Sequence, residues 1–466
     1  MTVTEGRPSR TARLAGAWRS GPLSVPGFRL LTIGQFTSTI GDYCYAVALP
    51  WLVLSGGGSA ATLGIVLACY GIPRALLTVP GGSLADRFGP RLLMLSSDFA
   101  RCALTAVFAV LAAAHVSSLA AVAPVAALLG ALSALFMPAS MTMMPSLVDS
   151  ARLTAANAVY TGFVQAGSLL GPVIGGILVA STGPATAFSV DAGSYLVSAV
   201  TVAFISARGT RTAGAAAPAA DGDRSPEEAA IALAAADGIA PDEAAIALAS
   251  AGDPAAAAAE PAPRNVWVLL RQARVFQIIL VVSLTANFAL IGTTEVALPA
   301  LAHARFGADG YGAVLTCVAV AALAGALVVG KLGDRFRPVT LIVGSLIAGA
   351  AGIAAAPFLG GLPGVAAGMA LFGLGIGFDN VVSVTLIQRW APPALLGRVW
   401  GILLLASAGS FPVATFVAGL LTRHLGPAPV FVISGGLLAL SMLFGLSQRE
   451  FRDFGTAGEE PAPVPA

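Results

Sequence analysis

The sequence predicts an all-α membrane protein whose twelve transmembrane helices form two pseudo-symmetric six-helix bundles. Its 466 residues are 57% hydrophobic and only 10% charged, and the mean hydropathy is +0.85. A soluble protein carries about 25% charged residues. The sequence also repeats: Asp-Arg-Phe at 86–88 recurs at 334–336, and Val-Ala-Leu-Pro at 47–50 recurs at 296–299. Two echoes at nearly equal spacing indicate one membrane module used twice.

A transmembrane helix needs about 20 consecutive apolar residues. Polar or Gly/Pro-containing segments divide the chain into twelve stretches of this kind. The first bundle is predicted to contain helices 30–54, 60–80, 92–114, 118–139, 157–180 and 185–206. The second is predicted to contain helices 276–300, 312–332, 339–359, 363–387, 399–421 and 428–447. Six helices in each half put both termini and the central segment on one side of the membrane.

The lysines and arginines predict which side that is. Of the 25, 21 fall in the tails, the central segment and alternate loops, and only Arg305 and Arg423 fall in the opposite loops. Cytoplasmic loops are enriched in these residues, so both termini are expected in the cytoplasm. The N-terminal tail shows no signal-peptide cleavage site, and the Arg- and Ala-rich composition is typical of GC-rich bacterial coding. We expect a multi-pass protein of the bacterial inner (plasma) membrane.

Composition predicts five segments along the chain. These are an N-terminal tail (1–29), a first bundle (30–206), a linker (207–264), a second bundle (265–448) and a C-terminal tail (449–466). The linker is rich in Ala and Pro and holds nine acidic residues and four arginines. Such a composition is typical of a flexible, solvated tether. A regulatory docking role for the linker is the alternative.

The repeated Asp-Arg-Phe triplet lies in a polar turn, Gly-Gly-Ser-Leu-Ala-Asp-Arg-Phe-Gly-Pro-Arg at 81–91, between two apolar stretches. Its glycines allow close helix approach, and its carboxylate can face a helix N-terminus or a neighbouring arginine. Such a cluster can hold one packing of the two halves and release it in another. The simpler interpretation is a positively charged loop with a tight turn, but the repeat favours the switch. The candidate switch residues are Gly82, Asp86, Arg87, Gly89, Arg91, Asp334 and Arg335.

This turn resembles the major facilitator superfamily, in which the loop between the second and third helices reads G-x-L-A-D-R-x-G-x-R. Residues 82–91 match it well, whereas the second copy has Arg337 where a glycine is expected. We therefore expect Asp86 to matter more than Asp334 for switching. Further segments resemble the drug:proton antiporter branch that includes macrolide and enterobactin exporters; these are 38–42, 98–101, 136–139, 153–157, 171–176, 385–389 and 397–399. The resemblance implies the major facilitator fold and alternating access.

A second motif of that resemblance is Gly171, Pro172, Gly175 and Gly176 in the fifth predicted helix. Glycines permit close packing and proline bends a helix. The motif is therefore predicted to bend this helix, with Pro412 in the eleventh as a possible partner. Ordinary packing of small residues is the alternative, and both descriptions can hold.

Charged residues inside the predicted spans are the candidate coupling groups. A carboxylate at mid-bilayer costs roughly 2.5–3.5 kcal/mol, so it usually faces a cavity or a partner. Asp42 lies midway along the first helix, and Glu295 lies in the pseudo-symmetric seventh, one turn before Pro299. We predict that both take part in proton coupling or cation binding. Alternatively, Asp42 is satisfied between helices and water solvates Glu295 near the outer end of its span.

Other polar residues in the spans have less specific interpretations. Asp98 and Arg101 are three residues apart in the third helix and can pair; Arg74 and Asp379 could pair with other helices, and Asp191 suits a cap or a helix interface. A cavity for a bulky, partly apolar compound is predicted to be lined by Phe36, Tyr43, Tyr160, Phe163, Gln165 and Asn287. Besides Asp42 and Glu295, the proton-coupling or substrate-cavity candidates are Gln35, Tyr43, Asn287, Asp98 and Arg101.

The sequence offers no enzyme signature. Its three histidines have no metal-ligand spacing, its four cysteines lie apart in apolar stretches, and no P-loop is present. We therefore expect no enzyme activity, no metal, no cofactor and no nucleic-acid partner. The expected partners are a small-molecule substrate, protons and the lipid bilayer, and the chain is expected to be a monomer.

The first functional hypothesis is proton-coupled efflux of an amphipathic small molecule, such as a drug, antibiotic or secondary metabolite. The same fold could instead take up a metabolite or siderophore. A third hypothesis, from another class, is a non-transporting membrane sensor or scaffold. The energy source under the first hypothesis is the proton gradient.

Overall fold

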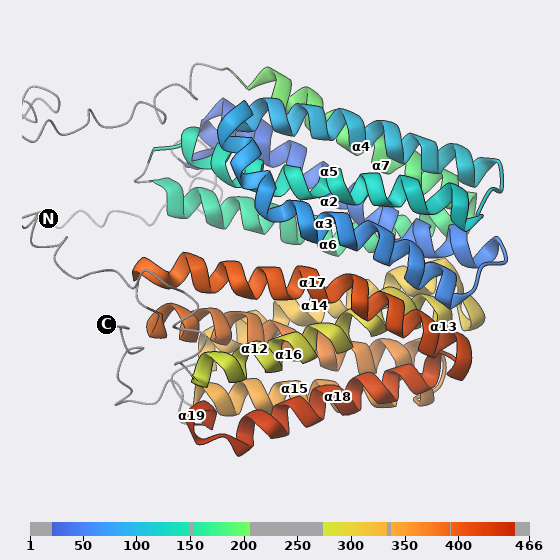
Figure 1. Ribbon diagram of the computed structural model, residues 1–466, viewed down its shortest axis with the longest axis vertical. Coiled ribbons are helices and arrows are strands. Elements are labelled where there is room, and N and C mark those ends of the chain that lie inside the picture. Colours follow the sequence, from blue (N-terminus) through green and yellow to red (C-terminus); the bar gives the residue numbers. More distant parts are fainter. Residues whose placement is uncertain (1–20, 150–151, 206–273, 333–336, 392, 453–466) are drawn as a thin grey trace, which may run out of the picture.

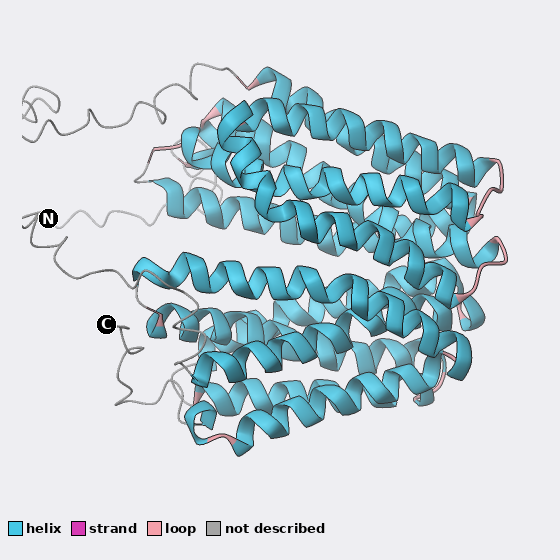
Figure 2. Ribbon diagram, viewed as in Figure 1, coloured by secondary structure: helices cyan, strands magenta, loops and turns pink. Residues whose placement is uncertain are grey.

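The computed structural model describes residues 21–149, 152–205, 274–332, 337–391 and 393–452. Within these ranges the chain is helical and forms no strand (Figure 2). The long helices of the first half are α2 (Pro26–Ser55), α3 (Ala60–Phe88), α4 (Pro90–Ala113), α5 (Leu119–Met143), α6 (Leu153–Thr182) and α7 (Pro184–Phe204). Those of the second half are α12 (Arg274–Gly292), α13 (Leu298–Arg305), α14 (Gly307–Leu332), α15 (Pro338–Ala355), α16 (Gly361–Trp390), α17 (Pro393–Leu425) and α18 (Pro427–Ser447).

The helices form two bundles that lie side by side, α2–α7 in one and α12–α18 in the other (Figure 1). The first and last described residues, 21 and 452, lie at the same end of the molecule. We call this end the terminal face and the opposite end the far face. The short helix α19 (Arg449–Arg452) lies at the terminal face, and the predicted linker 207–264 lies outside the described residues.

Glycine–proline pairs mark three of the helix boundaries. Gly89, Gly183 and Gly426 adopt φ values of 82°, 87° and 86°, and each is followed by a proline at the first position of the next helix. The left-handed region suits glycine, and proline suits the first helical turn because its missing N–H would have no partner there. These pairs make the abrupt reversals between α3 and α4, α6 and α7, and α17 and α18.

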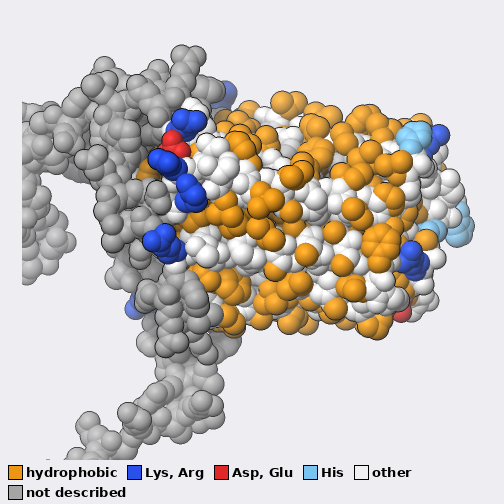
Figure 3. All heavy atoms as spheres, turned by 90° about the horizontal axis from the view of Figure 1, so that it is seen from below, with side chains coloured by type: hydrophobic (Ala, Val, Ile, Leu, Met, Phe, Trp, Pro, Cys, Tyr) orange, Lys and Arg blue, Asp and Glu red, His pale blue; other side chains and the backbone are white. Residues whose placement is uncertain are grey.

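The outer surface is that of a multi-pass membrane protein. Eleven helical segments of the described ranges are long and apolar enough to cross a membrane. Helix α2 has 30 residues but is more polar, because it carries Gln35, Asp42 and several hydroxyl groups. Figure 3 shows hydrophobic side chains over the middle of the visible face, with charged side chains toward its two ends. The predicted fold class is confirmed.

Two details of the predicted helices were wrong. Helix α3 continues to Phe88, so most of the predicted polar turn is helical and the reversal occurs only at Gly89. Ala85 is buried there, and the extra turns lengthen the packing of α3. The predicted span 276–300 is present within Arg274–Arg305, but its winding changes there, since α12 is followed by a π-helical segment, Thr293–Ala297 (η4), and by α13.

The bundles contact each other along two helix pairs that glycines bring close together. A Cβ at Gly64 of α3 would lie 2.4 Å from the carbonyl oxygen of Thr415 in α17. A Cβ at Gly312 of α14 would lie 2.2 Å from the carbonyl oxygen of Pro172 in α6. Both distances are too short for a side chain. The α3–α17 and α6–α14 contacts are therefore pseudo-symmetric seams that depend on small residues.

Candidate solute cavity

A cavity of about 510 Å³ lies between the two bundles. Its walls come from α2, α3, α4, α5 and α7 on one side and from α12, η4 and α17 on the other. The apolar part of the wall includes Leu49, Leu67, Leu129, Met137, Leu404 and Phe411. Its polar part includes Gln35, Ser38, Asp42, Tyr43, Tyr45, Tyr70, Arg74, Thr78, Arg101, Ser133, Tyr195, Glu295 and Ser407. This mixed lining suits an amphipathic solute.

Asp42 presents its carboxylate to this cavity from the middle of α2. The side chain is exposed on the cavity surface, and the Tyr195 hydroxyl donates a hydrogen bond to its Oδ1 at 2.5 Å. Arg74 of α3 lines the same cavity, with its guanidinium carbon 5.7 Å from the centre of the Tyr70 ring. The cavity thus contains both signs of charge on the first bundle alone.

Glu295 enters the cavity from the second bundle because the helix changes its winding there. The Leu298 N–H bonds to the Thr293 carbonyl five residues earlier, which defines the π-helical turn. Pro299 has no N–H to donate to the carbonyl of Glu295 four residues before it. π-helical turns are frequent at functional sites. The half-buried Glu295 side chain lines the cavity and forms no ion pair with any described residue.

A buried ion pair lies at the cavity wall, to which its arginine, Arg101, contributes. Arg101 pairs with Asp98, as their spacing predicted, and the Ser198 hydroxyl donates to Asp98 Oδ2 at 2.7 Å. The guanidinium carbon lies 4.2 Å from the centre of the Phe136 ring and 4.3 Å from that of Tyr195. Such contacts favour a cation. Because Tyr195 also binds Asp42, it connects the cavity carboxylate to the buried pair.

Asp191 is fully buried at the interface of α7 with α2, well inside α7 rather than at its N-terminus. Its Oδ1 accepts a hydrogen bond from Ser194 at 3.4 Å, and a Cβ at Gly41 would lie 2.5 Å from this oxygen. Of the two predicted roles, the structure therefore gives Asp191 the interface role. Gly41 is required because α2 passes directly over these polar atoms.

Several residues predicted to line the cavity lie elsewhere. Phe36 packs edge-on against Phe163 with ring centres 5.7 Å apart, and Tyr160 shares a hydrogen bond with Ser140 at 3.0 Å. Neither these three aromatic residues nor Gln165 are among the cavity-lining residues of the described chain. That prediction is wrong because sequence position along a helix does not give the rotation of the helix about its axis.

Asn287 lies next to the cavity wall rather than in it. The Ser407 hydroxyl donates to Asn287 Oδ1 at 3.1 Å, and Ser407 is the residue that lines the cavity. The prediction also missed Tyr70 and Tyr195. Isolated tyrosines in apolar helices carry no pattern that would have identified them.

The predicted switch residues are only partly described. Arg91 donates to the carbonyl oxygens of Val202 at 3.4 Å and Ala203 at 2.5 Å, at the end of α7. Arg87 is exposed, with its guanidinium carbon 5.5 Å from the centre of the Phe88 ring. Gly82 and Gly89 have open space where a Cβ would project. The side chain of Asp86, and all of Asp334 and Arg335, lie outside what the structure describes.

The glycine motif of α6 packs against two neighbouring helices, α2 and α14. Cβ atoms at Gly171 and Gly175 would come within 2.5 Å of Tyr43 and 2.9 Å of Cys44 on α2. A Cβ at Gly176 would lie 2.9 Å from the Ala308 carbonyl oxygen on α14. The motif therefore packs α6 tightly between its own bundle and the other one.

The bundles are joined at the far face. The Ser55 hydroxyl and His303 Nε2 are 3.2 Å apart, and the Trp51 and Tyr311 rings stack with centres 5.8 Å apart. Both contacts connect the end of α2 with the second bundle. The cavity lining instead continues toward the terminal face through Thr78 of α3. This state is closed at the far face.

Leucine at Gly312 is expected to prevent this closure. The new side chain has no room against the Pro172 carbonyl, so the α6–α14 seam must separate. We expect the solute transport rate to fall at least about tenfold, equivalent to roughly 1.4 kcal/mol. Gly436→Leu is the matched control, because a Cβ there meets open space on the exposed side of α18. Wild-type transport by Gly312→Leu, at equal yield of folded protein, would refute the role of the seam.

Two helical bundles in a membrane, with a polar cavity between them that is closed at one end, define a membrane carrier for small solutes. The comparisons identify the family. The sequence profile of the Major Facilitator Superfamily matches residues 31–378 and 293–465. The chain belongs to the major facilitator superfamily.

Two named relatives are efflux pumps, one similar over most of the chain and one over about a third of it. The multidrug efflux pump Tap of Mycolicibacterium fortuitum is 28% identical over 432 residues, which is 91% of this chain and 94% of Tap. The multidrug efflux pump LfrA of Mycolicibacterium smegmatis is 31% identical over 179 residues, 38% of this chain and 33% of LfrA. The crystal structure of the nucleoside transporter NupG superimposes with a TM-score of 0.66 at 12% identity, covering 90% of this chain and 98% of NupG. This last similarity concerns the fold alone.

Proposed function

We propose that the protein exports amphipathic small molecules by proton-coupled alternating access. Its relatives Tap and LfrA are named multidrug efflux pumps, and the cavity combines aromatic and aliphatic walls with charged groups. The proposal includes a bacterial inner membrane, with the terminal face in the cytoplasm. It rests on the sequence pattern, in which 21 of the 25 lysines and arginines fall in segments expected on that side.

The observation that carries the proposal is the position of Asp42 and Glu295. They come from pseudo-symmetric helices of different bundles and line one cavity. A proton that binds to either carboxylate neutralises its charge. The free energy of that charge depends on how much water reaches it, and this differs between the two access states. Protonation and substrate binding can therefore favour different access states, which is what coupling requires. The seams at Gly64 and Gly312 are the surfaces about which the bundles would move.

The switch loops complete the proposal. Asp86 belongs to the first copy of the repeated turn, near the end of α3, and Arg91 of the same copy binds the carbonyl end of α7. We propose that this loop holds the terminal ends of the helices in one access state. The weaker second copy, with Arg337 in place of glycine, makes Asp86 the more important of the two acids.

Export of ethidium, a fluorescent amphipathic cation, tests the function. Cells that express the protein should extrude preloaded ethidium faster than control cells, and a protonophore should remove the difference. Oriented membrane vesicles separate export from uptake: the proposal expects accumulation only in inside-out vesicles. Accumulation in right-side-out vesicles would show an uptake carrier. Co-purification of a partner, with no solute moved in either orientation, would support a sensor or scaffold.

A further inference from the structure

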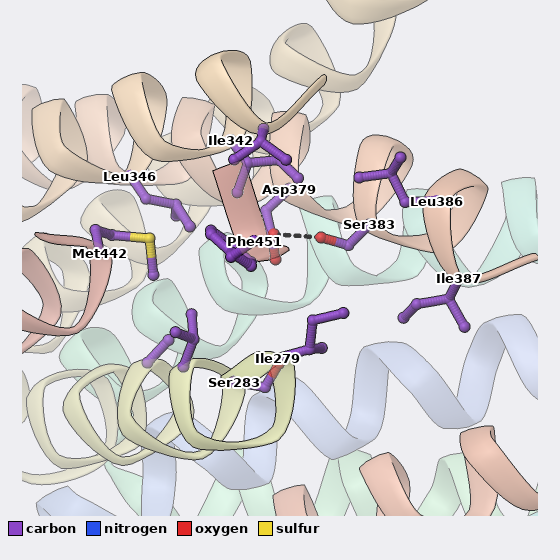
Figure 4. Close-up of a pocket in the computed structure, with 13 residues that line it drawn as sticks. Ile279, Ser283, Ile342, Leu346, Asp379, Ser383, Leu386, Ile387, Met442 and Phe451 are labelled. Atoms are coloured by element: carbon purple, nitrogen blue, oxygen red, sulfur yellow. Dashed lines mark hydrogen bonds between the residues drawn. The ribbon is translucent and has the colours of Figure 1, made fainter. Parts of the chain in front are cut away.

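A second pocket lies inside the second bundle, apart from the central cavity. It measures about 50 Å³ and lies among α12, α15, α16, α18 and α19. Its wall is apolar except for Asp379, Ser383 and Ser283. Figure 4 shows the Asp379 carboxyl group at the pocket, hydrogen-bonded to Ser383. Leu346 and Met442 lie on one side of it, and Leu386 and Ile387 on the other.

Few groups in this pocket stabilise the charge of the Asp379 carboxylate. The Ser383 hydroxyl donates to its Oδ1 at 2.7 Å, and no lysine or arginine among the described side chains forms an ion pair with it. A carboxylate within a membrane-spanning helix is costly, and such residues usually face a partner. The candidate partner is a cation that the described side chains do not supply.

The pseudo-symmetry of the fold shows what fills this place in the first bundle. Gly130 of α5 abuts the Tyr70 carbonyl and Gly373 of α16 abuts the Val318 carbonyl, so the two glycines are equivalent. They are 243 residues apart, the same separation as Phe136 and Asp379. Asp379 therefore occupies the position of Phe136, the ring over which the Arg101 guanidinium lies in the first bundle.

The second bundle lacks that guanidinium. The repeat of the Asp-Arg-Phe triplet, which starts at 86 and 334, places α4 and α15 in correspondence at a separation of 248, so Arg101 corresponds to Gly349 and Asp98 to Leu346. Gly349 packs closely on α16, where its Cβ would lie 3.1 Å from Phe372 Cα. The first bundle fills the position with a built-in cation and its carboxylate. The second bundle has a carboxylate and a small cavity.

We propose that the Asp379 pocket binds a small organic cation, an alkylammonium group, at a site separate from the central cavity. The carboxylate would pair with the ammonium, the Ser383 hydroxyl would orient that carboxylate, and the alkyl chain would contact Ile342 and Leu346. A volume of about 50 Å³ exceeds what one water needs and suits a short chain. A metal ion fits poorly, because Ca²⁺ and Mg²⁺ take six or more oxygen ligands and three side chains here offer oxygen.

Phe451 closes the pocket toward the terminal face. It belongs to α19, is 5% exposed, and its ring lies 3.0 Å from the position of a Cβ at Gly445. An ion pair of 3.7 Å between Arg274 and Glu450 connects α19 to the start of α12. Phe451, on the short helix α19, thus covers the site on this side. The proposal goes beyond the proposed export function and does not depend on it.

Calorimetric titration of the purified full-length protein with n-butylammonium chloride, at constant ionic strength, tests the site. The wild type should show one saturable site that sodium and potassium chloride do not occupy. Asp379→Asn should weaken binding at least tenfold, whereas Asp42→Asn should leave it unchanged. Equal thermal unfolding midpoints of the wild type and Asp379→Asn would exclude misfolding as the cause.

Phe451→Ala provides a second readout that does not alter the carboxylate. Removing the ring should lengthen the pocket and improve binding of n-hexylammonium relative to n-butylammonium at least fivefold. No binding by the wild type, equal binding by Asp379→Asn, or loss of binding in Asp42→Asn would each overturn the proposal. The last result would place the cation in the central cavity. Failure of ethidium export would bear only on the proposed function.

Discussion

The double variant Asp42→Asn, Glu295→Gln is expected to lose uphill export of ethidium while keeping its downhill movement. Both substitutions preserve the shape of the cavity wall and remove the groups that bind protons there. One proton moving down 100 mV supplies about 2.3 kcal/mol, so losing one coupled proton should lower the attainable gradient roughly 50-fold. The measurement is the steady-state ethidium ratio across energised inside-out vesicles.

A surface control shows whether the cavity carboxylates are responsible. Glu450→Gln removes a carboxylate on the exposed surface of α19 and should leave the gradient unchanged, because exposed ion pairs contribute little. If the double variant builds a wild-type gradient, Asp42 and Glu295 are not the coupling residues. The downhill rate serves as the control for folding and substrate binding.

Arg101→Met is expected to destabilise the protein more than any other single substitution described here. The side chain is 4% exposed and Asp98 is fully buried, so the variant leaves a buried carboxylate with only the Ser198 hydroxyl as its partner. Removing one member of a buried ion pair typically costs about 3–5 kcal/mol. The midpoint of unfolding by sodium dodecyl sulfate, followed by circular dichroism, measures the loss.

The compensating double variant Asp98→Leu, Arg101→Met tests the cause. Replacing both charges with apolar groups of similar size is often neutral, so most of the lost stability should return. A double variant as unstable as Arg101→Met would show that the stacking of the guanidinium between Phe136 and Tyr195 matters more than its charge. Stability close to that of the wild type in Arg101→Met alone would refute both explanations.

Much of the fold could be predicted because duplication and hydropathy both act over long segments. Spans of about 20 residues and the repeated triplet were enough to place twelve helices in two halves, and the i, i+3 spacing was enough for the Asp98–Arg101 pair. The predicted polar turn failed because Leu84 and Ala85 favour continuation of α3 to Phe88. The local sequence identified the residues of the 81–91 segment, but it did not show that the last turns of α3 extend through them.

The cavity wall was harder to predict. Most helices here are apolar all round, so no amphipathic stripe shows which side faces inward. The ring centres of Tyr70 and Phe411 lie 6.3 Å apart only because the bundles meet along the α3–α17 seam. That seam depends on glycines far apart in the sequence. The π-helical turn at Glu295 was also missed, although Pro299 is the feature that accompanies it.

Proton movement driven by the substrate is the most direct test of coupled exchange. Purified protein is placed in liposomes that contain a pH-sensitive dye, and an ethidium gradient is imposed with no initial pH difference. Coupled exchange through the cavity predicts proton flux opposite to ethidium flux, and its absence in the Asp42→Asn, Glu295→Gln variant. Ethidium movement at the wild-type rate with no change in the internal pH would contradict it.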